Sequence, residues 1–186
     1  MSTTTPPAIG LLELSSIAKG FSCVDRMLKK APADLFWAKP ISSGKFIILI
    51  TGDVASVEEA LQEGVRFSEH HRVDHTYIPG VHEQILPAIQ EKCQKDLEMA
   101  SSAIIETVTV ASAVEALDYA LKTAQVTVSE LKLGTGIGGK AYFVIYGELS
   151  HIEASVEAAE KCLNTKLVHR EIIPRPFMEI GVRAEA

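Results

Sequence analysis

Ile9-Gly10-Leu11-Leu12-Glu13 is the stretch that decides the fold, because the chain repeats it. The related segment Ser102-Ala103-Ile104-Ile105-Glu106 follows 93 residues later. Further pairs recur at a spacing of 93 or 95: Asp25 and Asp118, Lys29 and Lys122, Gly44-Lys45 and Gly139-Lys140, Gly52-Asp53 and Gly147-Glu148, Ile78-Pro79 and Ile173-Pro174. This period is too long for a solenoid repeat. The sequence therefore predicts two copies of one whole domain, and such a duplication suggests an assembly with rotational symmetry.

Composition limits the class of protein. The 186 residues allow two domains of roughly 90 residues, each large enough for a core. A net charge of −6 argues against a nucleic-acid binder, and no apolar stretch approaches the ~20 residues of a membrane span. Because 47% of the residues are hydrophobic, we expect some surface to be hidden against partners. Three cysteines without a CxxC pair favour a reducing cytosol, and no signal peptide is recognisable.

Each copy shows the same predicted order of elements: strand, helix, strand, strand, helix, strand. In the first copy we expect strands at Ile9–Leu14, Leu35–Lys39 and Phe46–Ile50, and a last strand ending at Ile78-Pro79. Apolar residues at helical spacing predict one apolar face on each helix. For the first helices these are Ile17, Phe21, Val24, Leu28 and Val110, Val114, Leu117, Leu121; for the second helices, Val57, Leu61, Gly64, Ser68 and Ile152, Val156, Ala159, Leu163.

This βαββαβ order is that of the ferredoxin-like fold, in the α+β class. Both helices of each domain should lie on one face of a four-stranded antiparallel sheet. We expect a disordered tail at residues 1–8, a first domain at 9–92 and a second at 98–186. The polar segment Gln90–Asp96 forms the junction, after a short terminal helix within Val81–Ile89.

The glycine-rich segment Gly134–Lys140 resembles two nucleotide-binding motifs. It satisfies GxGxxG, and it fails the P-loop pattern only because Ala141 stands where a hydroxyl is needed. Both motifs require a helix after the glycines, whereas here a strand is predicted from Ala141 onward. We therefore interpret the segment as a hairpin loop, equivalent to Ser42-Ser43-Gly44 in the first copy.

No group of residues predicts catalysis or metal binding. His70, His71 and His75 cluster, but neighbouring histidines point to opposite sides of a regular element, so a solvated helix end is favoured over a metal site. The cysteines have no partner that would make a nucleophile. Because Glu13 and Glu106 recur in both copies, we assign them capping, interface or fold roles. The same holds for Asp25 and Asp118.

In both copies these motifs resemble the bacterial microcompartment (BMC) shell proteins. The matching segments are Ile9–Glu13, Asp25-Arg26-Met27-Leu28-Lys29, Ser43-Gly44, Gly52-Asp53 and Ile173-Pro174-Arg175-Pro176. The tandem form is similar to the BMC-T class, and most similar to its PduT type, whose domains are unpermuted. The resemblance implies a homotrimer that forms a pseudohexameric tile, packs against other shell proteins in the bacterial cytoplasm and passes small polar metabolites through a central pore.

The resemblance also implies roles for individual residues. The pore would be lined by Ser42, Ser43 and Gly44 and by Ile137, Gly138 and Gly139. Lys29, Lys122 and Arg175 would lie at tile edges, although the first copy has Gly80 where the motif has arginine. Next to the pore loops, Lys45 and Lys140 would either face the channel or pair with carboxylates.

One departure concerns a cofactor. The PduT type carries a pore-loop cysteine that holds an iron–sulfur cluster, and a second cysteine early in a helix. Here the matching positions are Ser42 and Ala113. Serine is a poorer iron ligand than thiolate, so we expect no cofactor and do not transfer an electron-relay role.

Two other functions compete with the shell tile. A ferredoxin-like trimer could instead bind a small effector as a regulatory protein, which would require convergent polar groups at a subunit boundary. An enzyme would require a catalytic constellation, and the sequence offers none. The sequence therefore favours a structural shell protein.

Overall fold

The computed structural model describes residues 7–93 and 101–176. The first copy contains β1 (Ala8–Leu14), α1 (Ile17–Lys30), β2 (Asp34–Ile41), η1 (Ser42–Gly44), β3 (Lys45–Gly52), α2 (Val54–Ser68), η2 (Glu69–His71) and β4 (Arg72–Ile78). After α3 (Ile85–Ile89), the second contains β5 (Ser101–Thr107), α4 (Val110–Thr123), β6 (Thr127–Leu133), β7 (Ala141–Gly147), α5 (Leu149–Leu163), η3 (Asn164–Lys166) and β8 (Leu167–Pro174). The predicted βαββαβ order is confirmed in both copies.

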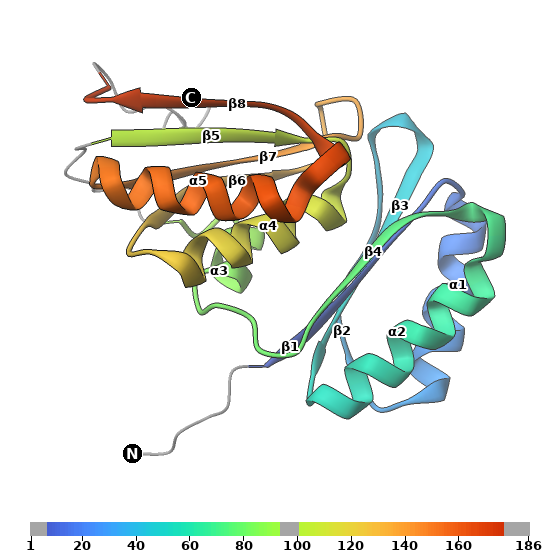
Figure 1. Cartoon of the computed structure of the whole chain (residues 1–186). Helices are drawn as coiled ribbons and strands as arrows, with labels where there is room; N and C mark the ends of the chain where they lie inside the picture. The colour runs from blue at the N-terminus through green and yellow to red at the C-terminus, as the bar shows by residue number, and fades with distance from the viewer. Residues whose placement is uncertain (1–6, 94–100, 177–186) are drawn as a thin grey trace, which may run out of the picture. The chain divides into compact units, whose positions relative to one another are not determined.

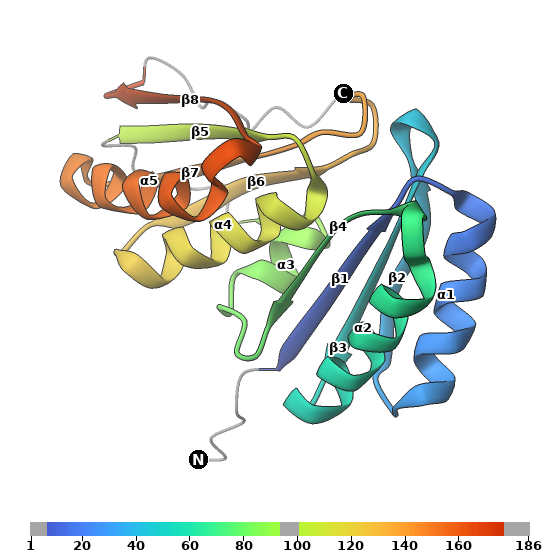
Figure 2. The same cartoon turned by 45° about the vertical axis from the view of Figure 1, so that its right-hand side comes forward.

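Each copy forms its own antiparallel sheet. The strand order is β2-β3-β1-β4 in the first and β6-β7-β5-β8 in the second, which is the same order in both repeats. In the first sheet α1 and α2 lie together on one face (Figure 1). In the second, α4 and α5 lie together on one face (Figure 2), and Ser155 of α5 donates to the Ala120 carbonyl of α4. The predicted ferredoxin-like architecture is therefore confirmed.

The chain's two compact units do not simply follow the two repeats. The first unit contains the described residues up to Val81 together with Thr109–Ala111 and Gly134–Gly139. The second contains His82–Val108, Ser112–Leu133 and the described residues from Lys140 onward. The first turn of α4 and the glycine-rich loop thus pack within the first unit.

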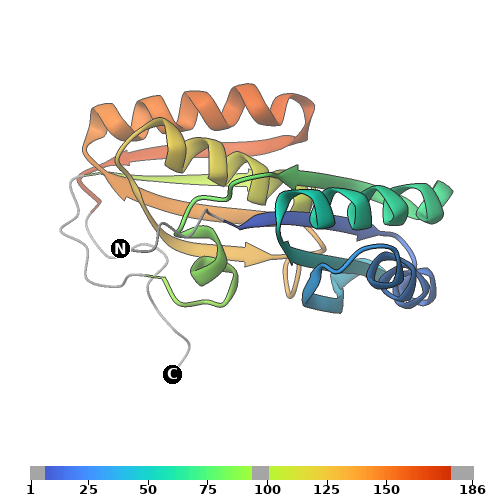
Figure 3. The same ribbon diagram turned by 90° about the horizontal axis from the view of Figure 1, so that it is seen from below.

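The short helix α3 belongs to the second unit, where it packs against β6 on the side of the sheet opposite α5 (Figure 3). Gln84, just before α3, ties it to the chain around β6 by accepting from the Val128 N–H and donating to the Val126 carbonyl. The predicted junction, Gln90–Asp96, falls partly outside the described residues. No helix in the described ranges is both long and apolar enough to span a membrane.

The predicted apolar faces of α2 and α5 are buried as expected, but that of α1 is not. The residues of α1 that are buried are Gly20, Cys23 and Met27. Phe21, from the predicted face, is instead 63% exposed. Gly20 and Cys23 let α1 approach the sheet closely, and Met27 fills the core beside them, whereas Phe21 lies on another side of the helix.

Gly20 sets the distance between α1 and β3. A Cβ at this position would overlap the ring of Phe46 and would lie 2.9 Å from its Cβ. Alanine in a helix is favoured over glycine by about 1 kcal/mol, but overpacking a core costs about 1–3 kcal/mol. Because the added Cβ would overlap the Phe46 ring, we expect a cost near the upper end of this range, so Gly20→Ala should lower the free energy of unfolding by up to about 2 kcal/mol in chemical denaturation. Gly80→Ala is the matched control, because a Cβ there meets nothing within 4 Å; equal losses would contradict the packing argument.

Candidate functional site

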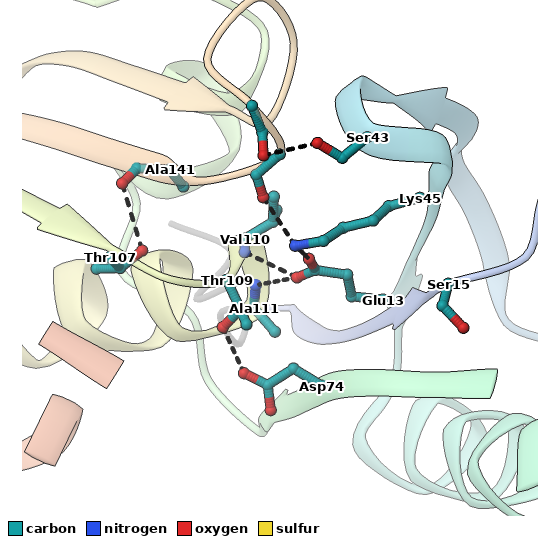
Figure 4. A network of polar contacts seen from close by, with 12 residues as sticks. Glu13, Ser15, Ser43, Lys45, Asp74, Thr107, Thr109, Val110, Ala111 and Ala141 are labelled. Carbon is teal, nitrogen blue, oxygen red and sulfur yellow. Dashed lines mark hydrogen bonds and ion pairs between the residues drawn. The ribbon is translucent and has the colours of Figure 1, made fainter. Parts of the chain in front are cut away.

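A buried carboxylate lies at the centre of a polar network in the first unit (Figure 4). Glu13 on β1 is fully buried, and its Oε1 is 2.8 Å from the Nζ of Lys45 on β3. Its Oε2 accepts hydrogen bonds from the backbone N–H groups of Val110, at 2.8 Å, and Ala111, at 3.3 Å. The first N–H groups of a helix have no partner within the helix and carry partial positive charge. Glu13 therefore caps α4 and neutralises Lys45 at the same time.

A second contact fixes the same turn of α4. The Thr109 hydroxyl, just before the helix, donates to Asp74 Oδ2 on β4 at 2.5 Å, and both side chains are buried. The other Asp74 oxygen accepts from the backbone N–H of His75. Two carboxylates from neighbouring strands thus hold the start of α4 in the first unit.

The two loops assigned to the pore lie against each other within this unit. The Ser43 hydroxyl donates to the Gly138 carbonyl at 2.9 Å, and the Gly136 N–H donates to the Ser42 hydroxyl at 2.9 Å. Lys45 Nζ donates to the Gly139 carbonyl at 3.0 Å. The structure therefore brings the two predicted loops together.

At Gly139, one of the points where these loops meet, there is no room for a side chain. A Cβ on Gly139, whose φ is +75°, would lie 2.9 Å from the Ser42 carbonyl oxygen. By contrast, a Cβ on Gly44 or Gly138 would meet nothing within 4 Å, although φ is positive at both. The loop between β6 and β7 runs into a strand and not a helix, as the sequence predicted, so it lacks the helix N-terminus that a phosphate-binding motif uses.

The second copy contains the same ion pair in a more open setting. Lys140 Nζ is 2.8 Å from Glu106 Oε1, and the two side chains are 49% and 37% exposed. Both lysines next to the loops are therefore paired with carboxylates, which was one of the two arrangements considered from the sequence. The recurrence of Glu13 and Glu106 in the sequence marks both residues but allows a capping, an interface or a fold role.

The three residues assigned to tile edges lie in different surroundings. Lys29, near the end of α1, forms an exposed ion pair with Asp25 at 2.7 Å. Lys122, at the same place on α4, pairs at 2.5 Å with Asp118, whose side chain is buried and also accepts from the His82 N–H. Arg175 is exposed after β8 and has a φ of +52°.

The remaining titratable groups form no reactive site among the described residues. Those residues contain no cluster of three or more His, Cys, Asp or Glu side chains suited to a metal ion. His70 and His71 lie in η2 after α2, with ring centroids 4.1 Å apart. Burial, with nearby carboxylates, raises the pKa of the Cys93 and Cys162 thiols to about 11, so little thiolate exists at neutral pH.

Comparison with known proteins identifies relatives along the whole described chain. The BMC domain profile matches residues 8–81 and again residues 101–176. The bacterial microcompartment shell protein PduT of Citrobacter freundii is 40% identical over 171 residues, which are 91% of this chain and 92% of that protein. The shell protein PduK of Salmonella typhimurium is 44% identical over 63 residues, or 33% of this chain and 39% of that protein.

Solved structures of microcompartment proteins also match this chain. A microcompartment protein from Desulfitobacterium hafniense DCB superposes with a TM-score of 0.81 at 40% identity, over 92% of this chain and 96% of that one. The fused permuted hexameric shell protein of the RMM microcompartment superposes with a TM-score of 0.66, over 86% of this chain and 84% of that one. At 15% identity, this second protein shares the fold alone.

Proposed function

The chain belongs to the BMC-domain family of bacterial microcompartment shell proteins, and we propose that three copies of it form one pseudohexameric tile of such a shell. The repeat carries the proposal. Each chain contributes two domains with the same strand order, so three chains supply six near-equivalent positions around a closed ring. The tile would pack edge to edge with other shell proteins in the bacterial cytoplasm, and its role would be structural and not enzymatic.

We propose that the two glycine- and serine-rich loops line a central pore. The loop of Ser42, Ser43 and Gly44 would alternate with that of Ile137, Gly138 and Gly139 around the axis. The hydrogen bonds between these loops in the first unit support this assignment. Small residues let backbone approach the axis, and hydroxyl and backbone groups suit small polar metabolites. Because Glu13 and Glu106 neutralise Lys45 and Lys140, we expect these lysines to give the pore no strong preference for anions.

An iron–sulfur cluster does not fit this loop. The residue at the relevant position is Ser42, and its hydroxyl already accepts a hydrogen bond from Gly136. Ala113, at the other position, has no ligating atom in its side chain and is fully buried. The tile is therefore proposed to act without a cofactor and not as an electron relay.

A measurement of size tests the tile. Size-exclusion chromatography with light scattering should give about three times the chain mass under conditions that prevent sheet growth, and electron microscopy at high protein concentration should show flat sheets. The same preparation should show no iron–sulfur absorbance. A regulatory protein would instead remain a discrete oligomer at all concentrations. A stable monomer would contradict the proposed trimer.

A further inference from the structure

Three cationic side chains lie near the end of α2 in the first unit, where α1 and α2 run side by side (Figure 1). Phe67 is in the last turn of α2, with Lys19 Nζ 3.7 Å and Arg26 Cζ 4.9 Å from the centre of its ring. Arg72 reaches the same end of α2, where its side chain donates to the Val65 carbonyl at 3.3 Å. We call Lys19, Arg26, Arg72 and Phe67 the cationic patch.

The three cations have no carboxylate partner among the residues that the structure describes. A neighbouring cation of the same helix does have one, since Lys30 of α1 pairs with Glu59 of α2 at 2.8 Å. Arg26 and Arg72 are exposed and Lys19 is half-buried, so an incoming group can reach their charged ends. The chain as a whole carries a net charge of −6, and the patch is therefore a local excess of positive charge on an acidic protein.

Lys19 lies where the helix itself disfavours a cation. Helix α1 begins at Ile17, so Lys19 is in its first turn, which contains no acidic residue. The N-terminus of a helix carries partial positive charge, and this charge favours aspartate or glutamate over lysine. A residue that breaks such a local rule without a gain for the fold marks a functional position.

The second copy forms the same pair of helices without the patch. The equivalents of the patch residues carry no positive charge: Ser112 for Lys19, Tyr119 for Arg26, Leu167 for Arg72 and Cys162 for Phe67. Near Cys162 lie the carboxylates of Glu115 and Asp118, which together with burial raise the pKa of its thiol to about 11. The fold therefore does not need the cations, and the equivalent place in the second copy has carboxylates nearby instead.

We propose that the cationic patch binds an acidic polypeptide segment of a partner protein. Carboxylates form charge-assisted hydrogen bonds with lysine and arginine, and three cations suit a segment with several carboxylates. Glutamate side chains also bring methylene groups, which can pack beside the Phe67 ring. The ring holds the ends of Lys19 and Arg26 before binding, so these side chains lose less freedom when the partner docks. This binding goes beyond the role of a shell tile and needs neither the trimer nor the pore.

A labelled peptide tests the patch directly. Fluorescence anisotropy at low ionic strength should show binding of an alternating glutamate–alanine octapeptide and no binding of the glutamine–alanine octapeptide. The net charge of −6 repels an acidic peptide from the protein as a whole, so binding reports a local site. Lys19→Gln together with Arg26→Gln should weaken binding about tenfold. Phe67→Leu should weaken it about two- to fivefold, and added salt should weaken binding to the wild type. Circular dichroism checks that the variants stay folded.

The matched control is Lys132→Gln together with Lys161→Gln, which changes the net charge equally but removes cations that are paired with Glu91 and Glu157. This control should bind the peptide like the wild type, and equal losses in both double variants would show that net charge decides binding. If inorganic phosphate at equal charge displaces the peptide, the patch is a simple anion site and the proposed partner is wrong. If the peptide instead blocks a self-association that the Lys19 and Arg26 double variant lacks, the occupant is a second copy. A trimeric wild type that binds no peptide would refute the patch and leave the tile intact.

Discussion

The Glu13→Gln substitution is expected to lower the free energy of unfolding by about 3 kcal/mol, whereas Glu106→Gln should lower it by less than about 1 kcal/mol. Both glutamates pair with a lysine at 2.8 Å, but only Glu13 is fully buried and holds the start of α4. Glutamine would keep the size of the side chain and remove its charge. It would leave the mostly buried Lys45 ammonium without its counter-ion.

The measurement is chemical denaturation at several protein concentrations, because a contribution from subunit assembly would depend on concentration. Circular dichroism follows the whole chain, and fluorescence of Trp37, the single tryptophan, follows the first unit. Lys45→Met tested alone and together with Glu13→Gln provides the control, since two members of one buried pair should be strongly non-additive. Equal losses at positions 13 and 106 would show that burial does not decide the strength of these pairs.

Much of the fold could be predicted from the repeat and the hydrophobic spacing. The order of elements and the buried faces of α2 and α5 are confirmed because their largest apolar residues are also the residues that pack on the sheet. The predicted buried face of α1 was wrong. Its residues in the core, Gly20, Cys23 and Met27, are small or moderately apolar, while Phe21 is strongly apolar and exposed. Periodicity reports where apolar residues lie on a helix and does not show which of them pack on the sheet.

The network around Glu13 could be predicted only in part. The recurrence of Glu13 with Glu106 and of Lys45 with Lys140 marked these residues, and the pairing of each lysine with a carboxylate was one expected arrangement. The partner of Glu13 could not be found, because it consists of backbone N–H groups 97 and 98 residues away in the chain. Backbone groups leave no signal in side-chain patterns, so the capping role needed the three-dimensional structure.

Replacing Lys29 and Lys122 together by alanine is expected to leave the trimer folded but to abolish the assembly of trimers into flat sheets of tiles. Exposed ion pairs between residues four apart on a helix contribute at most about 1 kcal/mol, so the loss of Lys29 should scarcely affect stability. At a tile edge, the same ammonium would donate to backbone carbonyls of a neighbouring tile, and each tile would repeat that contact around its perimeter. Each of these hydrogen bonds contributes little, but because every tile repeats them on all of its edges, together they decide whether a flat sheet of tiles grows.

The two lysines are not equal, which makes the single variants informative. Asp118 is buried, so Lys122→Ala would take the Lys122 counter-ion from a buried carboxylate, although the His82 N–H would still donate to it. Lys122→Ala should therefore cost more stability than Lys29→Ala. If the flat sheets of tiles were lost because the fold is destabilised, Lys122→Ala would weaken those sheets far more than Lys29→Ala. If both residues act at edges, each single variant should weaken sheets to a similar extent in electron micrographs at matched concentration, with the trimer mass unchanged. Arg175→Ala should behave in the same way, and unfolding of the double variant would place the lysines in the fold instead of at the edge.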